Sequence, residues 1–537
     1  MRTGRILWSL GLLVLCTAGA AHGQSAPADA ERTFWVFLER QPAACPGTDA
    51  ARARRALRGR NGVHCWQLPP ATQRALRATA GPLRTVSRWL GAVSVALTPA
   101  ERRAVEALPM VRRVQPLGLR LQRTAVRAPE VVQPGLAGLQ LATVNAVRAL
   151  DDGFDGRGVH LGFMDASYRG FQHTVFAPLR ASGRLRGLRD FTPGTQQGQH
   201  GQMVASVAVG YQPGRYVGPA HGATVWAATT EHTPYERNIE EDFFVAGLEW
   251  LERQGVDVVN ISLGYTRFDE GERSYMPAAL DGDTAVTTRA ADRAAALGVT
   301  VVTSAGNGGC ARAERCWYYV GTPADADSVI TVGAVRPDSS RASFSARGPT
   351  ADGRIKPDVA ALGTRVAVAN GRDTFVRGGG TSFAAPMVSG IAAQMLQANP
   401  RLRPLQVRAI LRQTASHPGR PNNRTGWGIA DGTAAVRTAV AWTRLWPPPL
   451  TQIEPPYPLR ATRRVQVVVR AAAGARHARI TLVDRLGRVQ IAQTMPLRAG
   501  YNRHALSVHS LPPGVYGYRV QADGHTRRGV VSVLPPS

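Results

Sequence analysis

Residues 378–390, with the sequence GGGTSFAAPMVSG, lead from a glycine-rich segment into a small and apolar run that continues at helical spacing to Leu396. Three glycines allow a tight turn and the close approach of another chain, so a loop is predicted to lead into a helix here. Ser382 falls at that junction, where N–H groups without intrahelical partners and the helix dipole favour a developing negative charge. Pro386 is expected in the first helical turn, which needs no amide donor. The position suits a nucleophilic serine, although a lone Gly-Thr-Ser is more often a helix cap.

The residues around this stretch, from about 134 to 444, alternate apolar strands with amphipathic helices. This alternation predicts an α/β fold with a mostly parallel sheet flanked by helices. The expected strands are 158–164, 223–228, 256–261, 299–303 and 329–332, and the expected helices are 239–253 after a cap at Asn238, 284–297 after a cap at Asp283, and 404–414. In open sheets of this kind, functional side chains gather at the carboxyl ends of the strands.

Polar residues stand at those strand ends. Asp165 follows an apolar run directly, His200 opens a second helix-like run, and Asn307 follows a strand and an Ala-Gly pair. Each of them alone would more often be a turn or cap residue. Asp165, His200 and Ser382 follow one another in the order aspartate, histidine, serine, which is the order of the triad in subtilisin.

Six motifs extend this likeness, namely 164–165 (MD), 200–201 (HG), 260–264 (NISLG), 304–307 (SAGN), 348–349 (GP) and 380–386 (GTSFAAP). With them, residues 134–444 resemble a subtilisin-like serine peptidase, or subtilase. The resemblance implies a secreted endopeptidase in which Ser382 attacks the peptide bond, His200 moves the proton and Asp165 orients the imidazole. It also implies that the Asn307 side chain and the Ser382 amide bind the oxyanion.

The sequence departs from the family pattern beside two of these residues. Ala166-Ser167 follows Asp165, and Gln202-Met203 follows His200-Gly201, where the family usually has other residues. Neither change removes a proton-transfer group, but both lie in the turns that aim the acid and the imidazole. The alternative reading is therefore a catalytically weak or inactive peptidase-like binding protein at the cell surface.

The resemblance also implies how polypeptide substrates bind. Ser262, Leu263 and Gly264 would pair with an extended substrate strand through main-chain hydrogen bonds, which favours broad specificity. A second group of small residues would line the pocket for the residue before the cleaved bond, and consists of Ala305, Gly306 and Gly321. Their size predicts a preference for a large apolar residue there.

This chemistry requires no cofactor, and no metal ligands are assigned. Asp281-Gly282-Asp283 offers two acids, which are too few for calcium without several carbonyl oxygens, and Asp283 is expected to cap the following helix. Structural calcium elsewhere is common among members of the family, so it stays open as an alternative.

Residues 1–23 have the pattern of a secretory signal peptide, with two arginines, a short apolar run and a small-residue end. No later segment is long and apolar enough to span a membrane, so the mature chain is expected to be secreted or attached to the cell surface. Four of the five cysteines lie beyond this leader. Proximity in the sequence favours the disulfides Cys45–Cys65 and Cys310–Cys316 over the two crossed pairings.

Residues 32–117 alternate strands and helices, which predicts a small α+β unit. The sequence 98–101 (TPAE) is a capping box that opens a helix to about residue 108. Given the peptidase resemblance, this unit resembles the inhibitory propeptides of the family, and the cut that releases it is expected between about residues 118 and 138. The chain would then have its own propeptide as a partner.

A proline-rich linker is predicted over 445–458, and short alternating strands over 459–537 predict an all-β sandwich. The expected strands are 465–470, 478–484, 488–493 and 514–522. This last unit resembles the sorting domains of the bacterial type IX secretion route, which would add the outer-membrane secretion machinery as a partner. The match is weaker than in the peptidase region, because the chain ends in LPPS rather than in a basic tail.

The formal net charge of +28 raises the question of nucleic-acid binding. Lys356 is the single lysine, and the arginines are spread over every segment of the chain. No zinc-finger spacing or aromatic RNA-binding signature accompanies them. The charge is therefore interpreted as compositional bias, and nucleic acid is not expected as a partner.

Overall fold

A seven-stranded sheet lies at the centre of the molecule, in the order β16-β15-β14-β13-β8-β12-β9, and each neighbouring pair is parallel. The predicted mostly parallel α/β fold is thereby confirmed. The strands are β8 (His160–Asp165), β9 (Leu185–Asp190), β12 (Thr224–Thr229), β13 (Val258–Ile261), β14 (Thr300–Ser304), β15 (Ile330–Val335) and β16 (Val359–Leu362).

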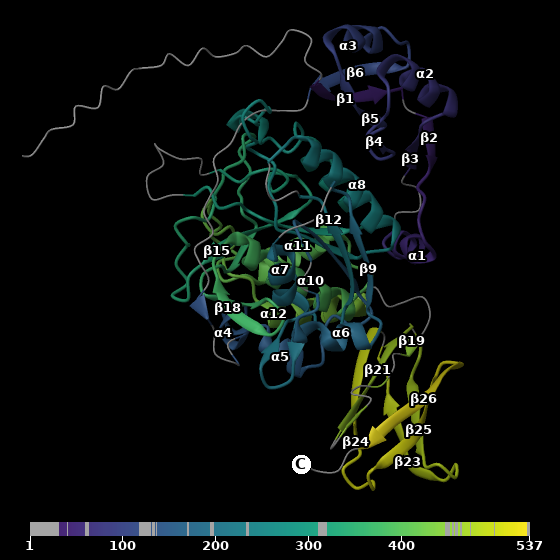
Figure 1. The fold of residues 1–537 in the computed structure, drawn as a ribbon. Helices are drawn as coiled ribbons and strands as arrows, with labels where there is room; N and C mark the ends of the chain where they lie inside the picture. The colour runs from purple at the N-terminus through teal and green to yellow at the C-terminus, as the bar shows by residue number, and fades with distance from the viewer. Residues whose placement is uncertain are drawn as a thin grey trace, which may run out of the picture.

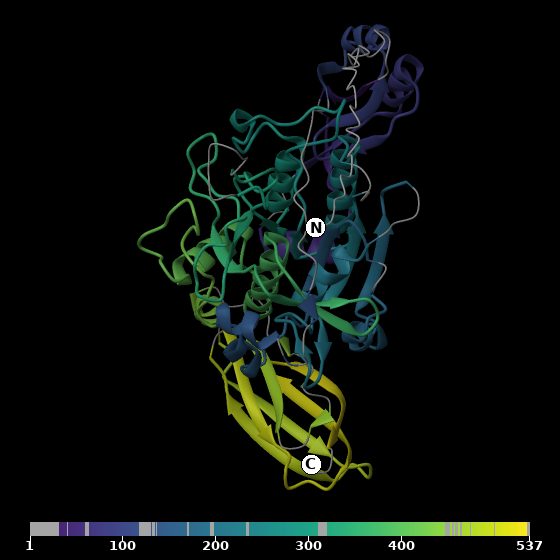
Figure 2. The ribbon, with the colours of Figure 1, turned by 60° about the vertical axis from the view of Figure 1, so that its left-hand side comes forward.

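This is a computed structural model. It describes residues 32–39, 41–59, 64–116, 130–131, 135, 137–168, 171–193, 198–231, 236–309, 319–445, 452–453, 456, 460–461, 464–472, 474–498 and 500–533. The predicted leader 1–23, the pair Cys310–Cys316 and most of the expected cleavage region lie outside these residues. Three folded parts follow one another along the molecule, here called the N-terminal unit (32–116), the central unit (137–445) and the C-terminal unit (452–533) (Figures 1 and 2).

Helices cover both faces of the central sheet because the apolar strands point alternate residues to opposite sides. Phe163 and Val302 belong to one buried cluster, with residues of α10 (Thr381–Ala398), whereas Met164 and Val301 belong to the other. The first cluster also holds residues of α7 (His200–Val209), α11 (Pro404–Thr414) and α12 (Gly432–Leu445), and the second holds residues of α8 (Ile239–Arg253) and α9 (Val286–Ala296).

Shorter elements complete the central unit, and β7 (Glu130–Val131), which precedes residue 137, pairs with its strand β18 (Thr374–Gly378). The shorter elements are α4 (Ala137–Thr143), α5 (Val147–Asp151), α6 (Ala177–Ala181), the 3-10 helices Thr174–Phe176 and Pro277–Ala279, the hairpin β10 (Tyr211–Gln212) and β11 (Tyr216–Val217), and the sheet of β17 (Val366–Asn370), β18 and β7. Only two residues separate the end of β18 from the start of α10, so the glycine segment turns directly from a strand into the helix that carries Ser382.

Helices α8 and α11 have the expected bounds and Asn238 is the N-cap residue of α8, as predicted, whereas the cap predicted at Asp283 is wrong. The Asn238 side chain does not cap α8; its Oδ1 accepts from the amide of Arg273 at 3.0 Å, so it holds a neighbouring loop. Asp283 does not cap α9, which begins at Val286. Asp281 instead accepts hydrogen bonds from the amides of Asp283 and Thr284 at 2.9 and 2.8 Å, because a local aspartate turn competes with the helix.

The N-terminal unit has a four-stranded antiparallel sheet in the order β4-β5-β1-β6, and two of its three helices share a core with that sheet. Its elements are β1 (Arg32–Leu38), β2 (Gln41–Ala44), α1 (Asp49–Leu57), β3 (His64–Gln67), α2 (Pro70–Ala80), β4 (Thr85–Ser87), β5 (Ala92–Leu97), α3 (Pro99–Glu106) and β6 (Val111–Pro116). The predicted capping box opens α3, with Thr98 Oγ1 accepting from the Glu101 amide at 3.2 Å. The predicted disulfide Cys45–Cys65 is present.

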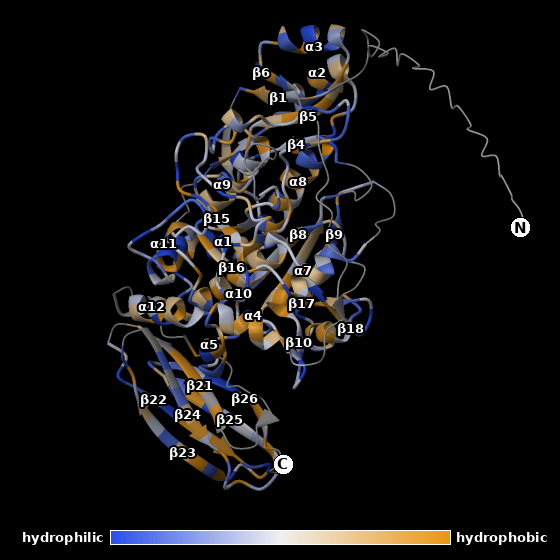
Figure 3. Cartoon of the chain, turned by 90° about the vertical axis from the view of Figure 1, so that its left-hand side faces the viewer, coloured by the Kyte–Doolittle hydropathy of each residue, from blue (hydrophilic) through white to orange (hydrophobic). Residues whose placement is uncertain are grey.

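The sheet of the N-terminal unit packs on α8 and α9, which Figure 3 shows beneath it. Trp35, Phe37 and Trp89 share a buried cluster with residues of those two helices. Ser87 Oγ donates to Glu249 Oε1 at 2.6 Å, and Ser94 Oγ donates to a carboxylate oxygen of Asp242. Burial raises the pKa of Asp242 to about 7, despite the opposing hydrogen bond from Ser94, so its protonated form suits this interface.

Helix α1 reaches further along the central unit than the sheet does. Arg55 donates from Nε and Nη2 to the two carboxylate oxygens of Glu252 at 2.9 and 2.7 Å, and Arg54 also pairs with Glu252. Arg58 pairs with Asp257 at 2.8 Å. Arg54, Arg55 and Arg58 are all buried. These three arginines are called the α1 anchor below. Through buried, hydrogen-bonded charge pairs they join the segment 45–65, whose ends are linked by the disulfide, to the central unit.

The C-terminal unit is built from two sheets, in the orders β19-β21-β24 and β20-β26-β25-β22-β23, around one buried cluster. The strands are β19 (Gln452–Ile453), β20 (Arg460–Ala461), β21 (Arg464–Ala471), β22 (His477–Val483), β23 (Val489–Pro496), β24 (Gly500–Ser507), β25 (Gly514–Ala522) and β26 (His525–Val533). Apolar and polar residues alternate along them (Figure 3). The unit is all-β, as expected, but β24 and β26 were missed because polar and charged residues interrupt their alternation.

No helix in the described part of the chain has the length and apolar character that crossing a membrane requires.

Candidate functional site

The carboxyl ends of the middle strands bring the predicted polar residues to one edge of the central sheet. Asp165, the last residue of β8, lies opposite Thr229 of β12, and Met164 lies opposite Ile261 of β13. Strand β14 joins the other side of β13 and leads to Asn307 three residues after its end. Parallel strands end at the same edge, so an acid, an amide and the segment after β13 meet there.

Asp165 and His200 form a hydrogen bond, with Asp165 Oδ1 2.6 Å from His200 Nδ1. The Asp165 carboxylate is fully buried and also accepts from the Ala166 amide at 2.8 Å, whereas the His200 side chain is 32% exposed. His200 is the first residue of α7, and Gly201 allows that helix to begin against β8. A Cβ added at Gly201 would lie only 2.5 Å from the carbonyl oxygen of Ser167.

The electrostatic surroundings of His200 favour its protonated form. Burial lowers the pKa of the imidazole, but the charge and the hydrogen bond of Asp165 outweigh this effect and raise the pKa above the ordinary value. The Phe383 ring packs beside the imidazole, with 5.8 Å between ring centroids. An imidazole that is held in one orientation by a buried carboxylate is well suited to receive a proton at Nε2.

Ser382 is the second residue of α10 and is buried. Its hydroxyl donates to the carbonyl of Ser262 at 3.3 Å, and among the described residues no hydrogen bond joins it to His200. The structure therefore places Ser382 at the same edge, on the helix whose Phe383 contacts His200, with its hydroxyl bonded to the segment that follows β13.

A chain of buried hydrogen bonds holds the backbone of Ser382. The helix begins at Thr381, so Pro386 is its sixth residue; the expectation that this proline lies in the first turn is wrong. Because Pro386 has no N–H, the Ser382 carbonyl lacks its helical donor, and Ser262 Oγ donates to it instead at 2.9 Å. Asn260 Nδ2 donates to Ser262 Oγ at 3.0 Å, and Ser389 Oγ donates to Asn260 Oδ1 at 2.9 Å.

From the sequence, Ser262 is expected to bind substrate, whereas Asn260 and Ser389 have no predicted role. The sequence does contain a sign of this role, because Asn260 is an amide within the apolar strand β13. In the structure its side chain is fully buried. A buried amide needs hydrogen-bond partners, and here they connect β13 to α10. This connection is called the Ser262 relay below.

The orientation of the Asn307 amide is fixed by its neighbour on α10. Asn307 Oδ1 accepts from the backbone amide of Thr381 and from Thr381 Oγ1, each at 2.9 Å. With the oxygen engaged, Nδ2 remains as the donor end of the amide. The donor and the N-terminus of α10 thus belong to one connected group.

The residues predicted to bind substrate also lie close to one another. Gly321 N donates to the carbonyl of Ala305 at 3.4 Å, and Tyr265, just after Gly264, donates its amide to the carbonyl of Thr322 at 2.9 Å. A Cβ added at Gly321 would approach Thr266 Oγ1 to 2.4 Å. Of the segment 262–264, Gly264 is exposed and Leu263 is half-buried, so its outer backbone faces solvent.

A group of carboxylates that was not predicted lies near the same edge. Glu231, Glu236 and Glu240 place one oxygen each within 4.8 Å of the others, which is a spacing that could hold a cation. Burial, followed by the charges of Glu240 and Glu236, raises the pKa of Glu231 well above its ordinary value. This group was not recognised in the sequence because its members are spread over a loop and the first turn of α8.

The chain is similar in sequence to proteins of one known family. The sequence profile of the subtilase family, Peptidase S8, matches residues 164–428. Subtilisin DY of Bacillus licheniformis is 31% identical over 282 residues, which cover 52% of this chain and 92% of that protein. Subtilisin Savinase of Lederbergia lenta is 29% identical over 302 residues, 55% of this chain and 97% of that protein. Alkaline elastase YaB of Bacillus sp. (strain YaB) is 27% identical over 354 residues, 65% of this chain and 80% of that protein.

The fold and these matches define the class of protein: the chain is a serine-type endopeptidase. More narrowly, it belongs to the subtilase family, with its central unit as the matching part.

The contact between Asp165 and His200 predicts how the imidazole titrates. In a Ser382→Ala protein, NMR titration should give His200 a pKa above the ordinary value of about 6.5, because Asp165 stabilises the charged form. Adding Asp165→Asn removes that charge and leaves only burial, so the pKa should fall below 6.5. The signal can be assigned by its loss in His200→Gln, and an unchanged pKa in the asparagine variant would contradict the contact.

Proposed function

We propose that Asp165, His200 and Ser382 form the catalytic triad of this peptidase. The observation that carries the proposal is the hydrogen bond of 2.6 Å between Asp165 and His200, at the sheet edge where α10 presents Ser382. Peptide hydrolysis then begins when Ser382 Oγ attacks the carbonyl carbon of the substrate and His200 Nε2 takes the hydroxyl proton. The leaving amine receives that proton, and water releases the acyl group by the reverse sequence.

The first step requires the Ser382 hydroxyl to change its partner. It donates to the Ser262 carbonyl in the structure, and rotation about the Cα–Cβ bond would direct it to His200 instead. That carbonyl lies in the segment 262–264, which the resemblance assigns to substrate pairing. A bound substrate strand would then occupy the segment and favour the reactive orientation, so that attack and binding are linked.

The negative charge that develops on the substrate oxygen would be stabilised by donors from two elements. Asn307 Nδ2 is one donor, since Thr381 holds the other end of that amide, and the Ser382 amide at the start of α10 is the other. The N-terminus of α10 adds a favourable dipole at the same point.

For the substrate we propose polypeptides bound in an extended form, with broad specificity and a large apolar residue before the cleaved bond. Support comes from the exposed edge at Gly264 and from the small residues Ala305, Gly306 and Gly321. For the N-terminal unit we propose the role of an inhibitory propeptide, supported by its packing on α8 and α9. Export of the chain, with cleavage between about residues 118 and 138, completes this proposal.

Ser382→Ala tests the proposed function. The variant should lose hydrolysis of a casein substrate and should remain uncut ahead of the central unit, because both reactions need the Ser382 nucleophile. Activity is read from released peptides, and cutting is read from the intact mass of the purified protein. Ser182→Ala, at an exposed serine just after α6, should keep most of the activity. A Ser382→Ala protein that hydrolyses casein at the wild-type rate would refute the triad, and cutting at the same place would assign processing to another protease.

Asn307→Leu tests the oxyanion donor. Removing one such donor should lower kcat by roughly 10²–10³-fold and leave KM nearly unchanged, because the lost hydrogen bond forms fully only in the transition state. Steady-state kinetics on a peptide p-nitroanilide measure both constants. If kcat stays at the wild-type value, Asn307 does not have this role.

The Ser262 relay predicts a rescue. Ser262→Ala should lower kcat about tenfold, because the Ser382 carbonyl is then buried without a donor and the nucleophile loses its fixed position. Adding Pro386→Ala supplies a helical N–H to the same carbonyl and should restore most of the lost kcat. The matched control is Pro404→Ala at the first residue of α11, which should restore nothing. A double variant no faster than Ser262→Ala alone would show that the relay does not position Ser382.

A further inference from the structure

Side chains, rather than another strand, complete the outer edge of β17. This strand lies at the edge of its sheet and pairs with β18 on one side only. The N–H and C=O groups of one residue in a strand point to the same edge, and those of every second residue share that edge. Ala367, Ala369 and Gly371 therefore direct their backbone groups away from β18, where buried polar groups need other partners.

The first half of this edge is held by residues that lie far from the catalytic histidine. Ala367 donates its amide to Gln140 Oε1 of α4 at 2.9 Å, and its carbonyl accepts from the Tyr216 hydroxyl at 2.9 Å. The amide of Ala369 donates to Ser206 Oγ, in the second half of α7, at 3.0 Å. These contacts fix β17 against α4 and α7.

The last part of the edge is held by two glutamines that stand on either side of His200. Gly371 donates its amide to Gln199 Oε1, and its carbonyl accepts from Gln202 Nε2 at 3.1 Å. Gln202 Nε2 also donates to Gln199 Oε1 at 3.1 Å and lies 3.5 Å from the carbonyl oxygen of Ala369. The side chain of Gln202 is fully buried, so water does not compete for these contacts. Both backbone groups of Gly371 are thus bound to the start of α7.

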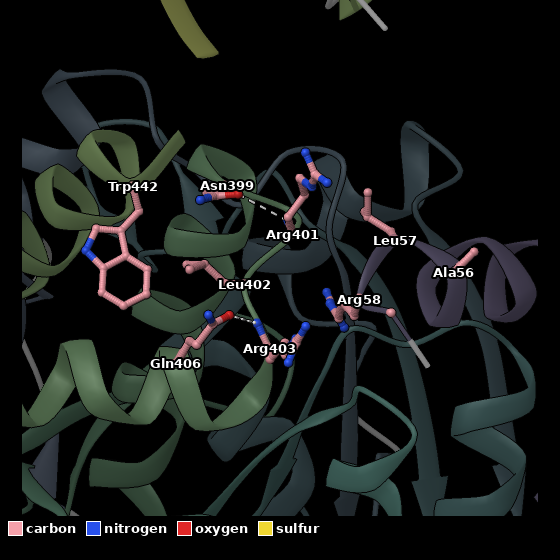
Figure 4. A pocket seen from close by; sticks show the side chains of 10 residues that line it. Ala56, Leu57, Arg58, Asn399, Arg401, Leu402, Arg403, Gln406 and Trp442 are labelled. Carbon is pink, nitrogen blue, oxygen red and sulfur yellow. Dashed lines mark hydrogen bonds between the residues drawn. The ribbon is translucent and has the colours of Figure 1, made fainter. Parts of the chain in front are cut away.

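This use of the two glutamines differs from the usual one at a helix start. A glutamine at the third helical residue often bonds back to the amide of the residue that precedes the helix. Gln406, the third residue of α11, does so: its Oε1 accepts from the Arg403 amide at 2.8 Å, as Figure 4 shows. Gln202 is the third residue of α7 but bonds to another element, and the side chain of Gln199 does not cap the helix either. Both side chains therefore serve the contact with β17.

The hairpin of β17 and β18 connects this contact to the helix that carries Ser382. At its open end Val366 pairs with Gly378, two residues before the start of α10. The Phe383 ring covers Gly378 so closely that a Cβ added there would lie 2.4 Å from a ring carbon. The first turn of α10 is thus packed on the open end of the hairpin, while the glutamines hold the end at which the chain turns.

We propose that Gln199 and Gln202 are positioning residues, which hold the imidazole of His200 in place relative to Ser382 by binding the start of α7 to this hairpin. The inference rests on the proposed triad. Gln202 is also one of the residues at which the sequence departs from the family pattern, so this departure supplies a contact of its own. Without the contact the start of α7 is free to shift, and a displacement of about 1 Å can lower a reaction rate by roughly 10²-fold.

Gln202→Met tests the proposal, because it removes the N–H donors and keeps the length of the side chain. Steady-state kinetics of the processed protein on a peptide p-nitroanilide should give a kcat about tenfold lower and a nearly unchanged KM. The apparent pKa of the rise of kcat/KM with pH should fall, since an imidazole that is less firmly held loses part of its contact with Asp165. The matched control is Gln140→Met, at an equally buried glutamine on the same strand edge, which should keep kcat within about twofold.

A second pair of variants separates the hydrogen bonds of Gln199 from its bulk. Gln199→Met should also lower kcat, whereas Gln199→Glu should keep it, because a carboxylate oxygen still accepts from the Gly371 amide and from Gln202. All variants are compared at a pH above their apparent pKa values and at a temperature where circular dichroism shows them folded. Equal losses in the two Gln199 variants would remove this residue from the proposal.

Two results would overturn the role of Gln202. One is a wild-type kcat in Gln202→Met, and the other is an equal loss of kcat in Gln202→Met and Gln140→Met, which would assign the effect to the hairpin in general. Ser382→Ala in the same assay distinguishes these results from a failure of the proposed function. Hydrolysis at the wild-type rate by Ser382→Ala would refute the triad itself, whatever the glutamine variants do.

Discussion

The hydrogen bond between Asp165 and His200 is the interaction on which the catalytic edge depends. It joins a fully buried carboxylate at the end of a central strand to the first residue of a helix on one face of the sheet. Such a contact needs the strand and the helix to meet closely, and Gly201 allows this where any side chain would strike the backbone of Ser167. The raised pKa of His200 follows from the same geometry.

The other half of the edge depends on α10, which is buried along its whole length. Burial fixes the position of its first turn, and the proline inside the helix creates a free carbonyl at Ser382 that Ser262 satisfies. The carbonyl that lacks its helical donor therefore connects Ser382 to the residue that follows β13, the strand next to β8. Asn307 is bound to the same turn through Thr381, so hydrogen bonds connect the start of the helix, the end of the strand and the amide.

Much of the fold could be predicted from the sequence because the spacing of apolar residues indicates which faces of a strand or helix are buried. Strands that are buried on both faces appear as continuous apolar runs, and α8 and α11 have the predicted bounds. The positions of Asp165, His200, Asn307 and Ser382 were predicted because each follows or opens such a run. The disulfide Cys45–Cys65 was favoured by proximity and is present. The leader, the pair Cys310–Cys316 and the sorting role of the C-terminal unit stay predictions.

Hydrophobic periodicity could not predict contacts between segments that are distant in the sequence. The Asn238 side chain does not cap α8 because it accepts from the amide of Arg273 in a distant loop. The cap at Asp283 failed for a local reason instead, since Asp281 forms a turn with the amides that follow it. The α1 anchor was missed because its arginines look like any others in an arginine-rich chain, and only docking reveals that they are buried against Glu252 and Asp257. Strands β24 and β26 were missed for a related reason, since their inward residues are identified by pairing rather than by alternation.

Covalent labelling with a fluorophosphonate tests the central claim most directly, because the reagent reacts with a serine only where a neighbouring base activates it and donors stabilise the resulting tetrahedral phosphorus. The account predicts that mass spectrometry of the processed protein finds one adduct, on Ser382, and that His200→Gln abolishes the labelling. Absence of an adduct on the processed wild-type protein, or labelling of Ser382 that persists unchanged without the imidazole, would contradict it.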